Sequence, residues 1–219
     1  MDNPHLRALH GPGLIEIVLG VSLSLLAGVA LAAAWLVIKP VETVKEPSEE
    51  ALPSVVYFVP GETSAASGRT WMRKRQVLLE GQTGDLAIFE QELNAWASAT
   101  LKPPAADATE TVVPGQINFR IRDSLLQIGA PSTLNIFGMS FPVVIQARGT
   151  FGPSTGNGPV FTAKELYLGS LAVHRVPGLT ATVMSNLSRV QSFPDDVVAG
   201  WKKLASASVD GEVVTLKLP

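Results

Sequence analysis

The chain has 219 residues, a formal net charge of −2 and no cysteine. The missing cysteines exclude disulfides, thiolate metal sites, a thiol nucleophile and an acylated lipoprotein anchor. From position 54 onward, 14 basic and 13 acidic residues almost cancel, which excludes the clustered basic face that nucleic acids require. We therefore expect one nearly neutral domain, without a metal or a cofactor.

An apolar stretch, Leu14–Ile38, follows a short polar tail (residues 1–13) and contains a single ionisable side chain, Glu16. A helix of this length reaches roughly 37 Å, which is enough to cross a hydrocarbon core of about 30 Å. Backbone groups in lipid must be satisfied within the segment, so a spanning stretch of this kind has to be helical. We predict an uncleaved, single-pass membrane anchor that contacts the lipid bilayer.

A cleaved signal peptide is the alternative interpretation of this stretch, because Ala30-Leu31-Ala32 resembles a cleavage site. However, the apolar run continues past that site to Ile38, and the preceding tail carries only one basic residue, Arg7. Both features favour the anchor. Glycines and alanines along the stretch also leave open an oligomer formed through the anchor.

Residues 39–53 hold three prolines and four glutamates and are predicted to be an acidic linker. The basic charges flanking the apolar stretch are balanced, with Arg7 and the amino terminus on one side and Lys39 and Lys45 on the other. A short tail before a signal anchor usually stays in the cytoplasm. We therefore expect residues 54–219 to form an extracytoplasmic domain on the inner (cell) membrane.

The first half of the domain is predicted to begin with a short strand at 55–59 and a second strand at 70–79, with the basic cluster 73–75 on its solvated edge. Asp85 is expected to cap a helix over 88–101, whose apolar residues recur at helical spacing. Two prolines then end that helix.

From position 116 the period changes to two residues. Phe119 and Ile121 alternate with Arg120 and Arg122, which predicts a half-buried strand with one wet face. An antiparallel hairpin is predicted over 134–151, followed by a strand with a bulge near Lys164-Glu165, where the apolar residues change phase.

The last third is predicted to contain a helix over 179–190 and a second helix that begins near Asp195-Asp196. A hairpin with its turn at Asp210-Gly211 closes the chain. The predicted fold class is therefore α+β: one N-terminal transmembrane helix, then one domain in which a curved, mostly antiparallel sheet packs against about three helices.

The order of these parts resembles the YpmS-like membrane-anchored domains of unknown function. It is more loosely similar to the tubular lipid-binding (TULIP-like) and mannan-elongation-factor-like envelope proteins. The likeness covers about residues 86–218 and rests on the following segments: Glu92-Leu93-Asn94-Ala95, 116–128 as one long strand, Ile136-Phe137-Gly138 leading into 141–151, Leu166-Tyr167-Leu168-Gly169, and the C-terminal hairpin. The resemblance implies an extracytoplasmic domain with an apolar groove between sheet and helices, and it supplies no catalytic residues.

Candidate catalytic residues are few. Gly152-Pro153-Ser154-Thr155-Gly156 satisfies G-x-S-x-G, but a nucleophile elbow needs a strand, a turn and a helix, and here strands are predicted on both sides. His174 is the single histidine beyond the apolar stretch, which is too few for a zinc site without nearby carboxylates.

These observations favour a non-catalytic, membrane-anchored module that binds an apolar, lipid-like ligand or an envelope protein. The predicted ligand-binding residues lie on the apolar sheet face: Phe119, Phe141, Ile145 and Phe161. A scaffold subunit that docks a membrane complex through its helix and an exposed patch is the alternative, and an envelope enzyme is a third hypothesis.

Overall fold

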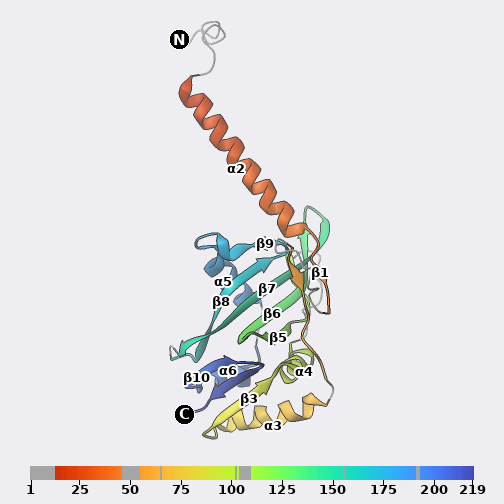
Figure 1. The fold of residues 1–219 in the computed structure, drawn as a ribbon, viewed down its shortest axis with the longest axis vertical. Helices are drawn as coiled ribbons and strands as arrows, with labels where there is room; N and C mark the ends of the chain where they lie inside the picture. Colours follow the sequence, from red (N-terminus) through yellow and green to blue (C-terminus); the bar gives the residue numbers. More distant parts are fainter. Residues whose placement is uncertain are drawn as a thin grey trace.

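The structure is a computed structural model that describes residues 13–45, 55–64, 66–101, 103, 110–154, 156–190 and 193–219. Its helices are α2 (Leu14–Ile38), α3 (Ser67–Glu80), α4 (Glu90–Thr100), α5 (Leu179–Val190) and α6 (Asp195–Lys202). Most strands are antiparallel, and the predicted α+β class with one N-terminal apolar helix is confirmed. Figure 1 shows α2 projecting from one end of the domain.

Two antiparallel sheets form the domain. The large sheet has the order β4-β6-β7-β8-β9, with β5 also paired to β6. Its strands are β4 (Val112–Pro114), β5 (Asn118–Arg122), β6 (Leu125–Ile136), β7 (Met139–Ser154), β8 (Pro159–Leu168) and β9 (Leu171–Ala172). The small sheet has the order β10-β11-β3 and comprises β3 (Asp85–Phe89), β10 (Ser206–Asp210) and β11 (Val213–Lys217).

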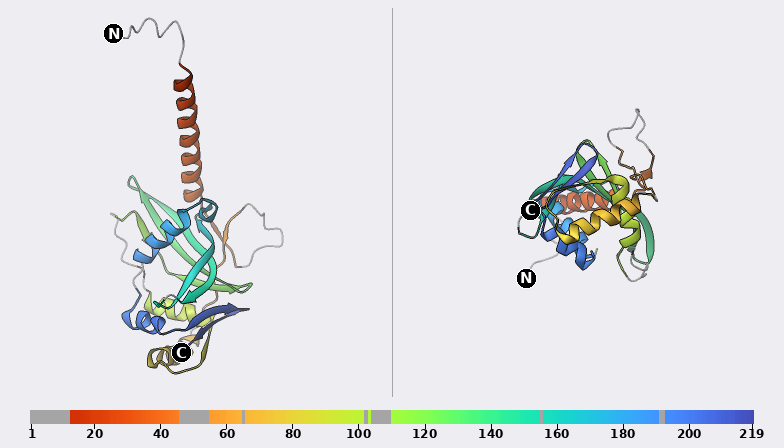
Figure 2. Two further views of the ribbon diagram at one scale, coloured as in Figure 1. Left: turned by 90° about the vertical axis from the view of Figure 1, so that its left-hand side faces the viewer. Right: turned by 90° about the horizontal axis from the view of Figure 1, so that it is seen from below.

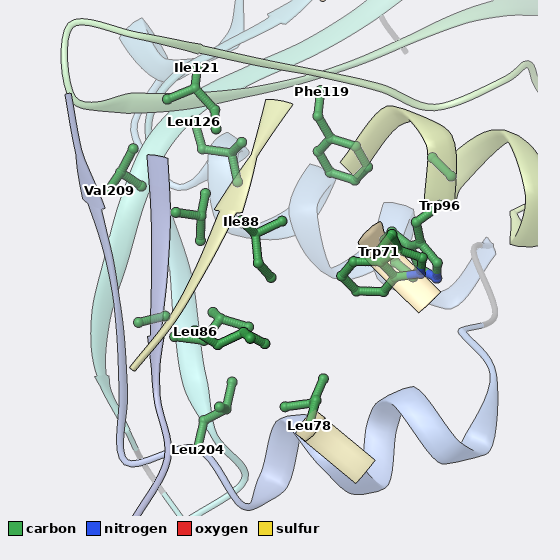
Figure 3. Packing of buried hydrophobic residues seen from close by; sticks show 14 of the residues in the cluster. Trp71, Leu78, Leu86, Ile88, Trp96, Phe119, Ile121, Leu126, Leu204 and Val209 are labelled. Atoms are coloured by element: carbon green, nitrogen blue, oxygen red, sulfur yellow. The ribbon is translucent and has the colours of Figure 1, made fainter. Parts of the chain in front are cut away.

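The small sheet lies at the end of the domain farthest from α2, together with α3, α4 and α6 (Figure 1). A hydrophobic core fills the space between these elements and the large sheet. Its aromatic centre is Trp96 on α4, whose ring lies 5.5 Å from that of Trp71 on α3 and 6.2 Å from that of Phe119 on β5 (Figure 3). Trp96 is buried, as its helical spacing predicted.

Two sequence predictions in the first half are wrong. Residues 70–79, predicted as a strand, belong to α3, which buries Trp71 and Leu78 at a spacing of two helical turns. Asp85 does not cap a helix, because it begins β3, in which Leu86 and Ile88 face the core. The helix starts later, at Glu90, where the Glu92 carboxylate accepts a hydrogen bond from the Phe89 N–H.

In the second half, the hairpin over 134–151, the two C-terminal helices and the last hairpin are confirmed. The predicted bulge is also present. The pairing of β7 with β8 passes from Arg148–Glu165 directly to Gly149–Ala163, so Lys164 is the extra residue on β8 and has no paired position on β7. The long strand over 116–128 is wrong, since Asp123 and Ser124 form a tight turn with φ of 53° and 56° between β5 and β6. The last turn falls one residue later than predicted, on Gly211-Glu212.

The predicted boundaries of the anchor match α2. Gly13 donates its N–H to the Glu16 carboxylate at the start of the helix, at the positive end of the helix dipole. This helix is long and apolar enough to cross a membrane, and none of the residues in its most apolar stretch is buried against the domain. It is therefore not a core helix of the domain. Its length and composition fit a membrane anchor or a signal sequence.

The predicted linker makes contacts with the domain. Glu42–Thr43 (β1) pairs in parallel with Tyr57–Phe58 (β2), and the Val44 N–H donates to the Phe58 carbonyl at 3.0 Å. Residues 46–53 lie outside the described part of the chain. The segment that follows α2 is thus tied to the segment that opens the domain.

Candidate functional site

A groove of about 770 Å³ lies on the face of the large sheet that does not contact the core. It extends from Leu36, near the end of α2, to Asp123 in the β5–β6 turn. Its floor is the sheet, and one wall is the segment 55–59. The groove therefore extends from α2 along the large sheet to the β5–β6 turn, and we take it as the candidate binding site.

The strand register aligns charged and polar side chains across the floor in rows. Arg120 lies opposite Gln127, Gln127 opposite Arg148, and Arg148 opposite Glu165. Side chains at paired positions share a face of the sheet, so this row crosses four strands on the groove side. The neighbouring row contains Gln146 and Tyr167 and lies nearer to α2.

The wall is held on the sheet by two glutamine side chains. The Gln146 amide donates to the Tyr57 carbonyl at 3.3 Å, and the Gln127 amide donates to the Val59 carbonyl at 3.2 Å. Gln146 is only 3% exposed. A buried side-chain amide that donates to a backbone carbonyl is costly to replace, because the carbonyl would then be buried without a hydrogen bond. The wall of the groove is therefore built into the fold.

One buried side chain on α4, Asn94, fixes both the floor and the wall. Its amide donates to the Phe119 carbonyl at 2.7 Å and to the Glu62 carbonyl at 2.9 Å, and its oxygen accepts from the Phe119 N–H at 2.7 Å. The neighbouring Glu90 carboxylate accepts from the Ile121 N–H at 2.7 Å and from the Glu62 N–H at 2.6 Å. These side chains take the place of a missing strand along the outer edge of β5.

The end of the groove nearest α2 is closed by a tight contact. The Ser170 N–H donates to the Leu36 carbonyl at 2.9 Å, and the Gly169 N–H donates to the Val144 carbonyl at 2.9 Å. Gly169 has a φ of +59°, and a Cβ there would collide with the Val37 carbonyl oxygen. Only glycine meets both requirements, so this residue lets the turn between β8 and β9 lie directly against α2.

Four guanidinium groups and two carboxylates line the groove: Arg120, Arg122, Arg148, Arg175, Asp123 and Glu165. Arg148 and Glu165 are 3.5 Å apart, with side chains 33% and 38% exposed, so water screens this pair and leaves it weak. Arg122 is paired with Glu212 at 2.6 Å on the surface. The lining is therefore more basic than acidic, and its guanidinium groups can bind an anionic group.

Tyr167 lies among these charges. Burial raises the pKa of its phenol, the Glu165 carboxylate raises it further, and Arg175 and Arg148 oppose the shift. The phenol therefore stays protonated at neutral pH and remains a hydrogen-bond donor on the groove floor. Apolar side chains accompany it toward the α2 end: Leu36, Val55, Val56, Leu171 and Val176.

The structure places the four predicted ligand-binding residues away from this groove. Strand register puts Phe119, Phe141, Ile145 and Phe161 on the opposite face of the large sheet. Phe119 and Ile145 are buried, Phe161 packs against the core, and Phe141 is half-buried on the β6–β7 hairpin. Ligand binding at these four residues stays a prediction.

The remaining candidates have ordinary surroundings. Ser154 ends β7 and pairs with Pro159 of the next strand, so it does not lie on a strand-to-helix turn. His174 packs edge-on against Tyr167, and its Nδ1 lies 3.2 Å from the Leu166 nitrogen. The basic cluster faces in different directions, with Lys74 bound to Glu92 and Arg75 to Asp196. Among the described residues, no group of three acidic or histidine side chains could hold a metal.

Sequence reasoning missed the groove but not every part of it. The alternation that placed Arg120 and Arg122 on a wet face was correct. Arg148 and Glu165 come from strands distant in sequence, and the register that aligns them with Arg120 has no local signal. The sequence predicts segment 55–59, the wall, only as a short strand. Its place over the sheet depends on hydrogen bonds from the side chains of Gln127 and Gln146, which are distant in sequence.

The chain matches no protein-family model, no curated protein and no solved structure. The resemblance to YpmS-like and tubular lipid-binding domains therefore stays a prediction.

We expect Asn94→Ala to lower the free energy of unfolding by about 2–4 kcal/mol, because it leaves the buried Phe119 N–H and carbonyl without partners. Chemical denaturation of the full chain in detergent measures this. Ser98→Ala on the same helix is the matched control, since that hydroxyl bonds only the local Ala95 carbonyl and is exposed. A loss below about 1 kcal/mol for Asn94→Ala would show that β5 does not depend on this amide.

A second pair of variants isolates the contact between α2 and the domain. Gly169 and Gly211 both have positive φ, but nothing lies within 4 Å of a Cβ at Gly211. Alanine should cost about 1 kcal/mol at either position from backbone strain alone. Gly169→Ala should cost about 1–3 kcal/mol more, because it also forces the turn away from α2. Equal unfolding free energies for the two variants would contradict this contact.

Proposed function

We propose that the chain is a single-pass membrane protein whose domain binds an anionic amphiphile, such as an anionic lipid, in the groove and carries out no chemistry on it. The observation that carries the proposal is the arginine-containing row on the floor of a groove that ends at Leu36 of the apolar helix. A lipid in the bilayer has its headgroup directed away from the hydrocarbon core. The groove has the same arrangement along its length: its apolar end lies near α2, and its basic floor lies farther from the helix.

Several features support a ligand of this class. A guanidinium group binds phosphate or carboxylate through paired N–H donors, which suits an anionic headgroup. The volume of about 770 Å³ falls in the range of small-molecule sites. The apolar side chains near α2 offer a surface for the first methylenes of an acyl chain. A purely apolar ligand fits less well, because it would displace water from the guanidinium groups and the Tyr167 phenol and offer them no hydrogen-bond acceptor in return.

Binding can be tested with the full chain in detergent and two short-chain probes, dihexanoyl phosphatidylglycerol and dihexanoyl phosphatidylcholine. We expect the anionic probe to bind more tightly than the zwitterionic one in native mass spectrometry. The double variant Arg120→Gln/Arg148→Gln should weaken binding of the anionic probe by about tenfold or more, because it removes charge-assisted hydrogen bonds.

The control variant is Arg73→Gln on α3, an exposed arginine that does not line the groove. It removes the same kind of charge and should leave binding unchanged. Equal binding of the two probes, or equal losses in the groove and control variants, would contradict a headgroup site. In that case the alternative, a scaffold subunit that docks through its helix and an exposed patch, would be the better interpretation.

We also propose that the helix stays uncleaved and that the domain lies outside the cytoplasm on the inner membrane. The helix continues without a break past Ala32 to Ile38, which supports an uncleaved anchor, and the mainly acidic segment 39–53 fits a domain outside the cytoplasm. The chain has no cysteine, so Thr83→Cys at an exposed position far from α2 gives a single label site. A membrane-impermeant maleimide should label it in intact spheroplasts. Labelling that requires lysis of the membrane would place the domain in the cytoplasm.

A further inference from the structure

We propose that the tip of the β6–β7 hairpin, centred on Phe137 and Met139, inserts into the surface of the bilayer that α2 spans. Phe137 is 96% exposed and Met139 is 56% exposed, although both are large apolar side chains. The proposal rests on α2 being the membrane anchor described above, and it adds a second point of contact with the same membrane.

The hairpin tip lies at the level of the end of α2 along the long axis of the molecule (Figure 1 and Figure 2). β7 contacts the membrane helix near Val144, whose carbonyl accepts from Gly169, and the hairpin continues from there to its turn. The five residue-to-residue steps of strand from Val144 to Met139 extend roughly 17 Å. Figure 1 and the left view of Figure 2 show the tip reaching the level of the last turns of α2, to one side of the helix.

Trp35 marks the level of the membrane surface near this tip. It is exposed, lies in the last turn of α2, and is followed by Lys39 just after the helix. Tryptophan and lysine at the end of a spanning helix favour the boundary between hydrocarbon and water. An apolar hairpin that reaches this level meets the headgroup region of the bilayer.

The turn at the tip keeps Phe137 in an unfavourable backbone conformation. Phe137 has a φ of 51° and Gly138 a φ of 76°, the combination that a two-residue hairpin turn requires. Asparagine, aspartate or glycine normally occupies the first of these positions, and a bulky residue there is strained. Within the described part of the domain, packing does not compensate for this strain, because the Phe137 side chain is almost fully exposed. Strain at an exposed aromatic residue points to a role outside the fold.

The composition of the hairpin suits a bilayer surface. No charged residue occurs between Asp123 and Arg148. Exposed hairpins of soluble domains usually carry charges that prevent aggregation. The polar side chains near the tip have partners in the protein, since the Ser140 hydroxyl donates to the Asn135 side chain at 2.7 Å and Asn135 donates to the Glu110 carbonyl at 2.9 Å. Insertion at the tip therefore leaves these groups satisfied.

A bilayer explains the tip better than a second copy of the chain does. Stable protein interfaces bury on the order of 1,200 Å² or more, and two side chains at one turn cover far less. Apolar residues that enter the boundary between headgroups and acyl chains need no complementary partner surface. The anchor also holds the tip at the membrane at all times.

The test uses the full chain in liposomes, with a single cysteine at Met139→Cys carrying an environment-sensitive NBD label. We expect blue-shifted emission and stronger quenching by lipids that carry a nitroxide at acyl position 5 than at position 12, because insertion of this kind reaches about 5–10 Å deep. Thr83→Cys, at the far end of the domain, is the matched label position and should show neither effect.

Phe137→Asn in the Met139→Cys chain separates a membrane role from a structural one. Asparagine suits the left-handed turn, so the melting temperature should stay the same or rise, while nitroxide quenching should fall by about twofold or more. A purely structural role for Phe137 would lower the melting temperature and leave quenching unchanged, and that result would overturn the proposal.

Flotation of the liposomes separates this inference from the proposed anchor. A chain that floats with the liposomes, while its Met139→Cys label emits as in water, would overturn the hairpin insertion and leave the anchor intact. A label that is shielded but not quenched by nitroxide lipids would mean that protein covers the tip, which also overturns it. A chain that does not float would overturn both proposals.

Discussion

The groove depends on one buried amide. Asn94 bonds both backbone groups of Phe119 and the Glu62 carbonyl, so it joins α4 to the edge of β5 and to the segment that leads from the groove wall. A strand edge without partners is costly inside a protein and attracts other chains on its surface. Covering that edge with side chains from a helix satisfies it without a further strand. The outer face of the large sheet is thereby left free for the groove.

The division of the large sheet into two faces follows from this constraint. With β5 fixed at its edge, Phe119 and Ile121 pack into the core, and the arginines that alternate with them, Arg120 and Arg122, must face the groove. The bulge at Lys164 then matters for β8, since the extra residue restores Glu165 and Tyr167 to the groove face while Phe161 stays with the core. A one-residue change of register would exchange the two sets of side chains.

The sequence predicted those parts of the fold that have a local signal. The apolar helix, the alternating strand at 118–122, the bulge and the C-terminal elements were all readable from periodicity and turn residues. The strand predicted over 70–79 is wrong because the charged residues between Trp71 and Leu78 obscured the helical spacing of these two core residues. Gly81 was an available helix-stop signal, and the structure places it at the end of α3 with a φ of 68°. β3 was missed because its partner, β11, lies more than a hundred residues away in sequence. The groove could not be predicted for the same reason, since its walls meet only through long-range pairing.

The position of the groove relative to α2 limits what the site can select. The turn at Gly169 holds the end of α2 against the turn between β8 and β9, and Leu36 of α2 lines the groove. Under the proposed function, α2 would therefore keep the groove next to the bilayer, and a lipid would meet it at a high effective concentration. Modest affinity is then sufficient for occupancy, which agrees with a lining of partly solvated arginines rather than a closed, dry pocket. Selectivity in such a site comes from the charge and spacing of the guanidinium row, since every lipid in the leaflet offers a similar acyl chain. The proposed site would therefore distinguish ligands by headgroup, and a second membrane contact at the hairpin would fix its orientation toward them.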